Sequence, residues 1–320
     1  MFARLAPIAA LLAGILLSAQ MPGPAGFPPG VFLNRGALDA AASAGCTVTC
    51  PGDLGFGAVT AWVGFRCWQY AYSGNVADIW DSATGSATET LITCSNGNLV
   101  ATSPTAIATT CAVACSVKTL YDQTAGNNCT SATCNVTEQG AVANWPIFKY
   151  QSASCGTNSG LSCMQCPTTP TVTPLQSATA LTSTAQTFYM SIVFYDSTSS
   201  IQDYATNGAS QAIQHGNPAN TARITDNATN SATVTATDSV WHALQGTFAG
   251  ASSVIDLDGT VTTGLTVGTS AASGKFTLCS SLSACGPMVG YIAEYGMWPS
   301  TSTFSNSTMT TNQQSFYGGL

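Results

Sequence analysis

The sequence predicts an all-β protein, a β-sandwich of jelly-roll type with mostly antiparallel strands and a short C-terminal helix. Three observations support this prediction. Turn-forming residues recur about every eight to twelve residues, the segments between them alternate with the period of two that strands show, and helical periodicity is almost absent. Many short strands between Gly, Asn and Asp turns favour a sandwich over a parallel sheet.

The composition describes a globular chain with an uncharged surface. Of 320 residues, 45% are hydrophobic and only 7% are charged, against about 25% charged in an average globular protein. Hydroxyl and amide groups therefore dominate the surface. The formal net charge is −7 and the seven Lys and Arg residues are not clustered. Because phosphate recognition needs grouped cations, we expect no nucleic-acid partner.

The N-terminus predicts a secretory signal over residues 1–19. Arg4 supplies the positive start, and Leu5–Leu17 is an apolar stretch of signal length that is short for a membrane span. An uncleaved membrane anchor is the alternative. A Pro/Gly linker is expected over residues 20–36 and a single sandwich domain over residues 37–320. The predicted location is secreted or at the cell surface, with no membrane attachment after cleavage.

Thirteen cysteines fit export, since exported proteins use cysteine pairs as disulfides. Zinc at Cys163 and Cys166 is an alternative that lacks a fourth ligand. Connectivity cannot be deduced from spacing, but the spacing suggests local pairs. The expected pairs are Cys46/Cys50, Cys111/Cys115, Cys129/Cys134, Cys163/Cys166 and Cys279/Cys285, which leave Cys67, Cys94 and Cys155 over.

Two tight turns and a central strand stand out among the predicted elements. Asn96–Asn98 (Asn-Gly-Asn) and Asp258-Gly259 are hairpin signals, the second favouring a type I′ turn. Phe188–Tyr195 alternates with both faces largely apolar, as a strand covered on both sides does. Ala61–Tyr72 is dense in aromatic residues and predicts a buried strand or a short helix. The remaining predicted elements are strands at Val76–Trp80, Glu89–Cys94, Ser116–Tyr121, Ala232–Thr237, Trp241–Phe248, Ser253–Leu257 and Val289–Trp298, and a closing turn of helix within Ser300–Tyr317.

The segment Cys111–Cys129 has the most distinctive sequence in the chain, a close cysteine pair followed by VKTLYDQTAGNN. It resembles the catalytic domain of α-L-arabinofuranosidase B, where a cysteine pair and a short strand also precede Tyr-Asp-Gln-Ser-Gly-Asn-Gly-Asn. The likeness extends from Cys46 to Trp145, with Tyr72-Ser73-Gly74 similar to that family's Tyr/Phe-Ser-Gly. From Trp241 to Trp298 the chain resembles the broader concanavalin A-like (laminin-G-like) jelly roll. Both resemblances imply a concanavalin A-like β-sandwich.

The resemblance also implies a test of the chemistry. A retaining glycosidase needs two carboxylates about 5 Å apart, and the family's nucleophile is a Glu in an Asp-x-Glu-Asn-Asn context. The counterpart region His215–Asn230 offers only Asp226, and the counterpart of the family's Gly-Gly-Asp acid/base loop, Leu278–Pro287, has no carboxylate. We therefore predict that the family's catalytic pair is missing, with Glu294 and Asp226 as the remaining candidate acids.

Other chemistry finds little support. Only His215 and His242 could serve a triad, and no nucleophile elbow, P-loop or dinucleotide motif occurs. We expect no cofactor and no metal. Asp256 and Asp258 alternate onto one face of their hairpin, so structural Ca²⁺ is the alternative to solvated edge charges. Asp122 is expected to cap the turn that follows it, and binding of a ligand or Ca²⁺ by its carboxylate is the alternative.

Glycan binding is the function that these exclusions leave as the leading one. Sugar sites on a jelly roll use aromatic rings with amide and hydroxyl groups, and we expect Trp80 and Trp145 to be exposed ligand-binding residues while most other Trp side chains are core. The leading hypothesis is an exported protein that binds polysaccharide without classical catalysis. The alternatives are a divergent α-L-arabinofuranosidase-like hydrolase acting on arabinose-containing polysaccharide, and a structural surface or phage-tail module.

Overall fold

The computed structural model describes most of the predicted sandwich domain. The chain divides into two units, Met1–Arg35 and Gly36–Leu320, and every described residue belongs to the second. The predicted signal and linker lie outside the described residues. Within the described part of the chain, no helix is long and apolar enough to cross a membrane. The described residues are 48–81, 90–103, 115–124, 134–138, 145–149, 155, 161–167, 175–180, 188–196, 202–207, 211–215, 220–226, 230–267, 275–279, 286–318 and 320.

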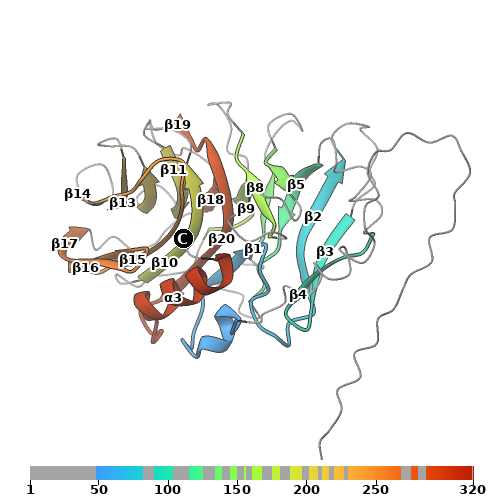
Figure 1. The fold of residues 1–320 in the computed structure, drawn as a ribbon, viewed down its shortest axis with the longest axis horizontal. Coiled ribbons are helices and arrows are strands. Elements are labelled where there is room, and N and C mark those ends of the chain that lie inside the picture. The colour runs from blue at the N-terminus through green and yellow to red at the C-terminus, as the bar shows by residue number, and fades with distance from the viewer. Residues whose placement is uncertain are drawn as a thin grey trace, which may run out of the picture. The chain divides into compact units, whose positions relative to one another are not determined.

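One layer of the fold consists of six described strands paired antiparallel in succession, called the first layer below. These strands can be followed in Figure 1. The centre of this layer is the pair β10–β20, in which Ile192 opposes Tyr295. The alternation of Phe188–Tyr195 thus becomes a central strand, as predicted. In spatial order the strands are β17 (Thr260–Val267), β16 (Gly250–Leu257), β15 (Trp241–Phe248), β10 (Phe188–Asp196), β20 (Gly290–Pro299) and β1 (Ala61–Gly64).

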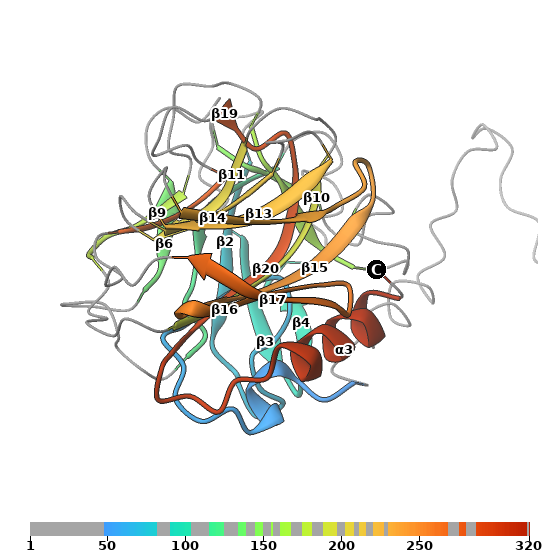
Figure 2. The same cartoon turned by 90° about the vertical axis from the view of Figure 1, so that its left-hand side faces the viewer.

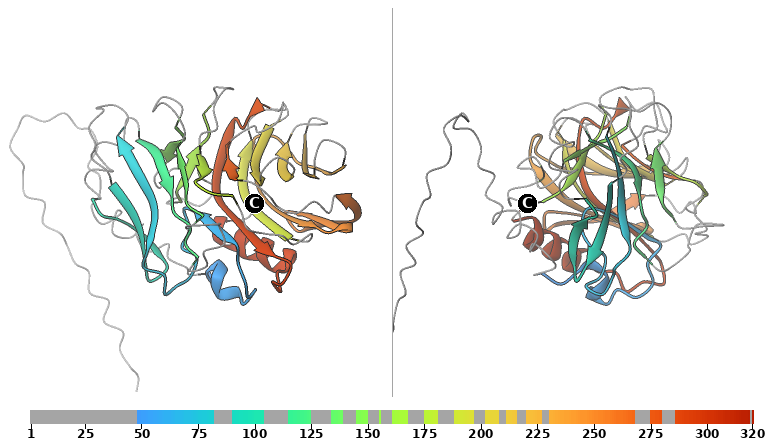
Figure 3. Two further views of the ribbon diagram at one scale, coloured as in Figure 1. Left: turned by 180° about the vertical axis from the view of Figure 1, so that it is seen from behind. Right: turned by 90° about the vertical axis from the view of Figure 1, so that its right-hand side faces the viewer.

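The other strands follow one another by antiparallel pairing in a second, longer layer, and both layers can be followed in Figures 2 and 3. In spatial order they are β14 (Asn230–Thr235), β13 (Thr221–Asp226), β12 (Gln211–His215), β11 (Gln202–Asn207), β18 (Phe276–Leu278), β9 (Leu175–Ser177), β6 (Val136–Glu138), β5 (Cys115–Leu120), β2 (Asn75–Asp81), β3 (Thr90–Ser95) and β4 (Asn98–Ala101).

Three short strands complete the hydrogen bonding. β7 (Ile147–Lys149) and β8 (Cys163–Gln165) connect the layers, because β7 pairs with β5 while β8 pairs with β20. β19 (Gly286–Pro287) runs parallel to β11. The predicted all-β sandwich with mostly antiparallel strands is confirmed.

The principal core lies between the two layers. Alternate residues of β10, Phe188, Met190, Ile192 and Phe194, point into it and are at most 1% exposed. Residues of β13 such as Ile224 meet them from the second layer. Burying a side chain of this size contributes about 1.5–3 kcal/mol, so this interdigitation is the main stabilising term.

The outer face of the first layer is covered too. The 3₁₀ helix η1 (Pro51–Leu54) and the helix α3 (Asn306–Tyr317) pack there, α3 against β15 and β16 (Figures 1 and 2). Trp62, Trp298 and Met309 form a second apolar cluster beneath this cover. The cover explains why β10 and β20 are apolar on both faces. It also confirms the predicted short C-terminal helix.

Both hairpin predictions are confirmed. Asn96 and Gly97 have φ values of 49° and 75° between β3 and β4, and Asp258 and Gly259 have 53° and 88° between β16 and β17. Positive φ at both central residues defines a type I′ turn, which Asn-Gly and Asp-Gly adopt with little strain.

The disulfides correct the predicted connectivity. The described bonds are Cys67–Cys94, Cys155–Cys163 and Cys166–Cys279. The local pairs Cys163/Cys166 and Cys279/Cys285 were therefore wrong, because Cys163 and Cys166 turn to different partners, and no zinc site forms from them. The three cysteines left over are all bonded. Cys50, Cys115 and Cys134 also form disulfides, while their predicted partners Cys46, Cys111 and Cys129, like Cys285, lie outside the described residues.

Candidate functional site

The Tyr-Asp-Gln segment after β5 is hydrogen-bonded to β1 and to the loop that follows β1. The Asp122 carboxylate, 6% exposed, accepts hydrogen bonds from Trp62 N at 3.2 Å and from Thr124 N at 3.0 Å. Gln123 accepts from Trp68 N at 2.8 Å and donates to the Gly64 carbonyl at 3.0 Å. The bond from Asp122 to the amide two residues on is an Asx turn, so the expected capping role of Asp122 is confirmed.

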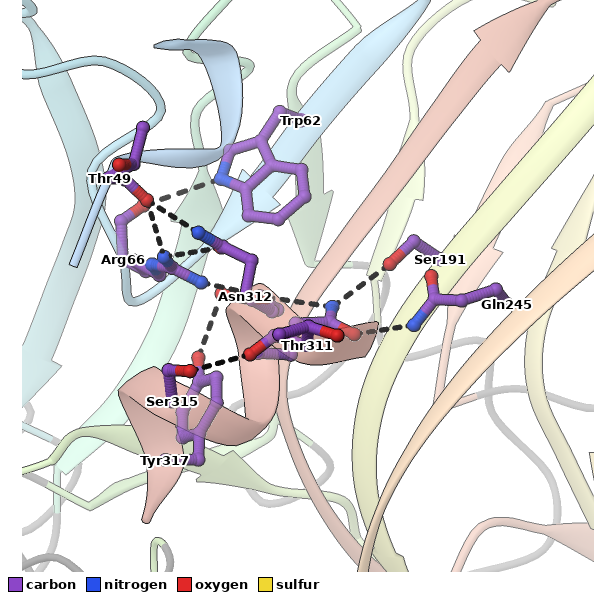
Figure 4. A network of polar contacts seen from close by, with 11 residues as sticks. Thr49, Trp62, Arg66, Ser191, Gln245, Thr311, Asn312, Ser315 and Tyr317 are labelled. Atoms are coloured by element: carbon purple, nitrogen blue, oxygen red, sulfur yellow. Dashed lines mark hydrogen bonds and ion pairs between the residues drawn. The ribbon is translucent and has the colours of Figure 1, made fainter. Parts of the chain in front are cut away.

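Glu294 lies in a buried polar network beneath α3. Figure 4 labels Arg66 and Tyr317, two of its partners, together with Asn312, Ser191 and Gln245 of the same network. Glu294 Oε1 accepts a hydrogen bond from Gln313 Nε2 at 2.8 Å, its Oε2 accepts one from Tyr317 Oη at 2.9 Å, and Arg66 Nη1 is 3.7 Å away. Gln313 extends the network to Ser191 and Gln245 on the sheet, and Arg66 extends it to Asn312 and the Thr49 carbonyl.

This environment fixes what Glu294 can do. Burial raises the pKa of the Glu294 carboxyl, while the Arg66 charge and the two donated hydrogen bonds oppose that rise. Its side chain is 0% exposed, and the three polar partners of its carboxylate, Arg66, Gln313 and Tyr317, are all donors. A substrate therefore has no route to this carboxylate, and the geometry is that of an anchor for α3 rather than of a general acid.

Asp226 ends β13 and is 2% exposed. It belongs to the second layer, whereas Glu294 points from the first layer toward α3. The structure therefore does not bring the two candidate acids together across a pocket. A shallow groove of about 410 Å³ beside η1 and α3 offers no carboxylate either; its lining consists of Val48, Leu54, Ser307, Thr308, Thr311, Asn312 and Ser315.

The two aspartates of the β16–β17 hairpin have local partners. Asp256 Oδ1 accepts from Gly259 N at 2.9 Å, and Asp258 bonds both Ala243 N and His242. Both residues thus serve the turn, and Asp258 forms an ion pair rather than a solvated edge charge. No group of three or more His, Cys, Asp or Glu side chains able to hold a metal ion occurs among the described residues.

The predicted tryptophans do meet, on the outer side of β2. Ala77 and Ile79 point into the core, so Trp80 points away from it and is partly exposed. Trp145 packs edge-to-face on Trp80, with ring centroids 5.6 Å apart. Trp145 is only 6% exposed, which corrects the expectation of two exposed rings: Trp145 supports the ring that Trp80 presents.

Two charged side chains, Lys118 and Asp78, lie beside the Trp80 ring, and with Trp80 and Trp145 they are called the Trp80 face below. Lys118 of β5 places its Nζ 4.7 Å from the Trp80 ring centroid and 3.9 Å from Asp78 Oδ2. Glu138 of β6 lies within the field of Lys118, and burial raises the pKa of its carboxyl while that lysine opposes the rise.

Sequence reasoning missed Lys118 and Asp78. Asp78 and Trp80 are two residues apart on β2, and the strand period puts them on one face. The sequence therefore allowed the prediction that Asp78 lies on the same face of the strand as Trp80. The approach of β5 to this face depends on strand pairing between distant segments, which no local pattern shows.

Comparison with solved structures supports the fold. The chain is similar to a GH54 α-L-arabinofuranosidase soaked with a cyclic sulfate inhibitor, with a TM-score of 0.57 at 13% sequence identity. An arabinofuranosidase complexed with arabinofuranosyl-α-1,2-xylobiose gives the same TM-score and identity. Each likeness covers 81% of this chain but 62% of the other, less than two thirds of its length.

No protein-family model matches the sequence, and no curated protein matches it. At 13% identity the likeness concerns the path of the chain and not its chemistry. The protein therefore has the β-sandwich fold found in these glycoside hydrolases.

Proposed function

We propose that this protein is an exported, disulfide-stapled β-sandwich of the concanavalin A-like type that binds polysaccharide through the Trp80 face, without the catalytic pair of the arabinofuranosidases. The single observation that carries this proposal is the partly exposed Trp80 ring, which packs edge-to-face with Trp145 and has the Lys118–Asp78 ion pair beside it. An aromatic ring presents a flat apolar surface to the C–H groups of a sugar, and the polar rim bonds its hydroxyls.

The positions of the acids support binding over hydrolysis. Glu294 is sealed beneath α3, and Asp226 belongs to the other layer. A retaining mechanism needs two carboxylates about 5 Å apart across an open cleft. Among the described residues, these two candidate acids do not meet that requirement. One of the similar enzymes was solved in complex with arabinofuranosyl-α-1,2-xylobiose, so arabinoxylan is the first ligand to test.

Binding is tested with the purified chain on arabinoxylan and on cell-wall polysaccharides by affinity electrophoresis and calorimetry. Trp80→Ala is expected to weaken binding about tenfold or more, since ring contacts contribute about 0.5–1.5 kcal/mol beyond their buried area. Tyr70→Ala is the matched control, because Tyr70 is a 57% exposed aromatic residue outside the Trp80 face. Equal loss in both variants, or no retention on any polysaccharide, would contradict the proposal.

The hydrolase alternative has its own test. Incubation with a nitrophenyl arabinofuranoside should give no turnover, and Glu294→Gln should lower stability without changing glycan binding. Removing that carboxylate leaves Arg66 buried and unpaired, which costs about 3–5 kcal/mol. Turnover by the wild-type chain that disappears in a folded Glu294→Gln variant would refute the binding-only function.

A further inference from the structure

A row of polar side chains crosses the outer face of the first layer beneath α3. Ser191, Gln245 and Asp256 lie directly opposite one another on β10, β15 and β16, and opposed residues of antiparallel strands project to the same face. Figure 4 shows Ser191 and Gln245 pointing from the sheet toward the helix. α3 also packs on β16 and places the Thr310 hydroxyl close to the Asp256 carboxylate, though not in hydrogen-bonding geometry.

Three oxygen atoms in this place lack a hydrogen-bond partner. Gln245 Oε1, Asp256 Oδ2 and Thr310 Oγ1 are all buried, and none of them has such a partner in the described part of the structure. The three residues, called the Asp256 site below, are at most 1% exposed. Buried polar atoms are costly when nothing pairs with them. Because all three atoms carry lone pairs, the group that would satisfy them together is a cation.

The charge of Asp256 leads to the same chemistry. Burial raises the pKa of its carboxyl, the Gly259 amide and the Thr310 hydroxyl oppose the rise, and the like charge of Asp258 adds to it. The cationic groups on neighbouring elements are engaged elsewhere, Arg66 with Glu294 and His242 with Asp258. A buried carboxylate is strongly unfavourable unless a counter-ion balances it.

We propose that the Asp256 site binds a monovalent alkali cation such as Na⁺ beneath α3, and that this ion joins β15, β16 and the helix. A carboxylate, an amide oxygen and a hydroxyl are hard oxygen ligands, which suit alkali and alkaline-earth ions rather than transition metals. The site supplies one negative charge, whereas Ca²⁺ sites gain their affinity from several charged ligands. The single charge therefore matches a monovalent ion. This inference is independent of glycan binding.

The experiment compares thermal unfolding of the full chain in NaCl and in choline chloride, each at about 0.15 M, so that screening by salt is the same. An ion that binds only the folded state stabilises it by mass action. We expect the melting temperature to be higher in NaCl by about 2 °C or more, which for a chain of this size corresponds to about 1 kcal/mol. Broadening of the ²³Na NMR signal by the folded protein is the direct measurement of binding.

Variants separate this site from general attraction of Na⁺ to an acidic protein. Asp256→Asn keeps the shape of the side chain and removes its charge, so it should abolish the difference between the two salts. Asp53→Asn deletes the same charge from an exposed position on η1 and should preserve that difference.

Two neighbouring threonines of α3 provide a second, milder pair of variants. Thr310 faces the Asp256 site, whereas Thr311 is exposed and lines the groove beside η1. Thr310→Val should raise the NaCl concentration needed for half of the stabilisation several-fold, and Thr311→Val should leave it unchanged. This pair also decides the question if Asp256→Asn fails to fold.

Three results would overturn the proposal. Equal melting temperatures of the wild-type chain in the two salts would show that no alkali ion stabilises the fold. Stronger stabilisation by about 1 mM CaCl₂, a concentration at which weak calcium sites fill, would show that the ion is divalent. Equal behaviour of Thr310→Val and Thr311→Val would place any bound ion away from the Asp256 site.

Discussion

The imidazole of His242 lies between two acceptors. Its Nδ1 is 2.5 Å from Asp258 Oδ2 and its Nε2 is 2.8 Å from the Thr237 carbonyl oxygen. Only a doubly protonated ring can donate to both. Burial opposes that charge and lowers the pKa of His242, but the bonds to Asp258 and Thr237, with the charges of Asp258 and Asp196, outweigh it and raise the pKa above its ordinary value.

This single residue predicts a pH dependence of stability. Because the pKa of His242 is raised on folding, its contribution is fully present below the unfolded value, about 6.5, and is lost as the pH rises through the folded value. NMR titration of the His242 ring and thermal melts between pH 5 and pH 9 test this. Asp258→Asn should lower the His242 pKa and flatten the stability profile, whereas an unshifted titration would contradict it.

At the scale of elements, α3 is held to the first layer by polar contacts. Gln313 is 0% exposed, donates to Ser191 Oγ and Glu294 Oε1, and accepts from Gln245 Nε2. The helix has a Ser305 N-cap and a left-handed Gly318 at its end, both readable as local signals. The burial of its polar side cannot be predicted from the sequence, since a Gln in a polar helix is ordinarily solvated.

Neighbouring glutamines provide a matched test of this docking. Gln313→Ala should lower the free energy of unfolding by about 2–3 kcal/mol, because it leaves buried groups on Ser191, Glu294 and Gln245 without a partner. Gln314→Ala changes helix propensity equally but removes one half-buried bond to the Asp258 carbonyl, so it should cost less than about 1 kcal/mol. Equal costs in chemical denaturation would show that α3 is not anchored through Gln313.

At the scale of the whole molecule, disulfides connect distant parts of the chain. Cys166–Cys279 links the end of β8 to the end of β18 across 113 residues, whereas Cys155–Cys163 spans 8. In the chain-entropy model a closed loop of the first size is worth about 4.7 kcal/mol and one of the second about 2.5 kcal/mol.

Double replacement by alanine tests that difference. All four cysteines are at most 1% exposed, so packing losses are similar in the two variants. Cys166→Ala with Cys279→Ala should therefore destabilise the fold about 2 kcal/mol more than Cys155→Ala with Cys163→Ala, measured by denaturant unfolding of each variant. The reverse order would mean that local packing, not loop closure, dominates.

The sequence by itself determined the all-β class, both hairpin turns (the type I′ geometry at Asp258-Gly259 included), the central strand and the C-terminal helix. These depend on the period of side chains along one segment or on dihedral preferences of two residues, which are local properties. The Asp122 turn was predictable for the same reason.

The tertiary structure alone decided the rest. Disulfide partners, the burial of Trp145 and the closure of Glu294 beneath α3 all depend on segments that are far apart in sequence. The ion pair beside Trp80 likewise forms only when β2 and β5 pair. A side chain's chemistry depends on its neighbours, and in a sandwich of many short strands those neighbours come from other strands.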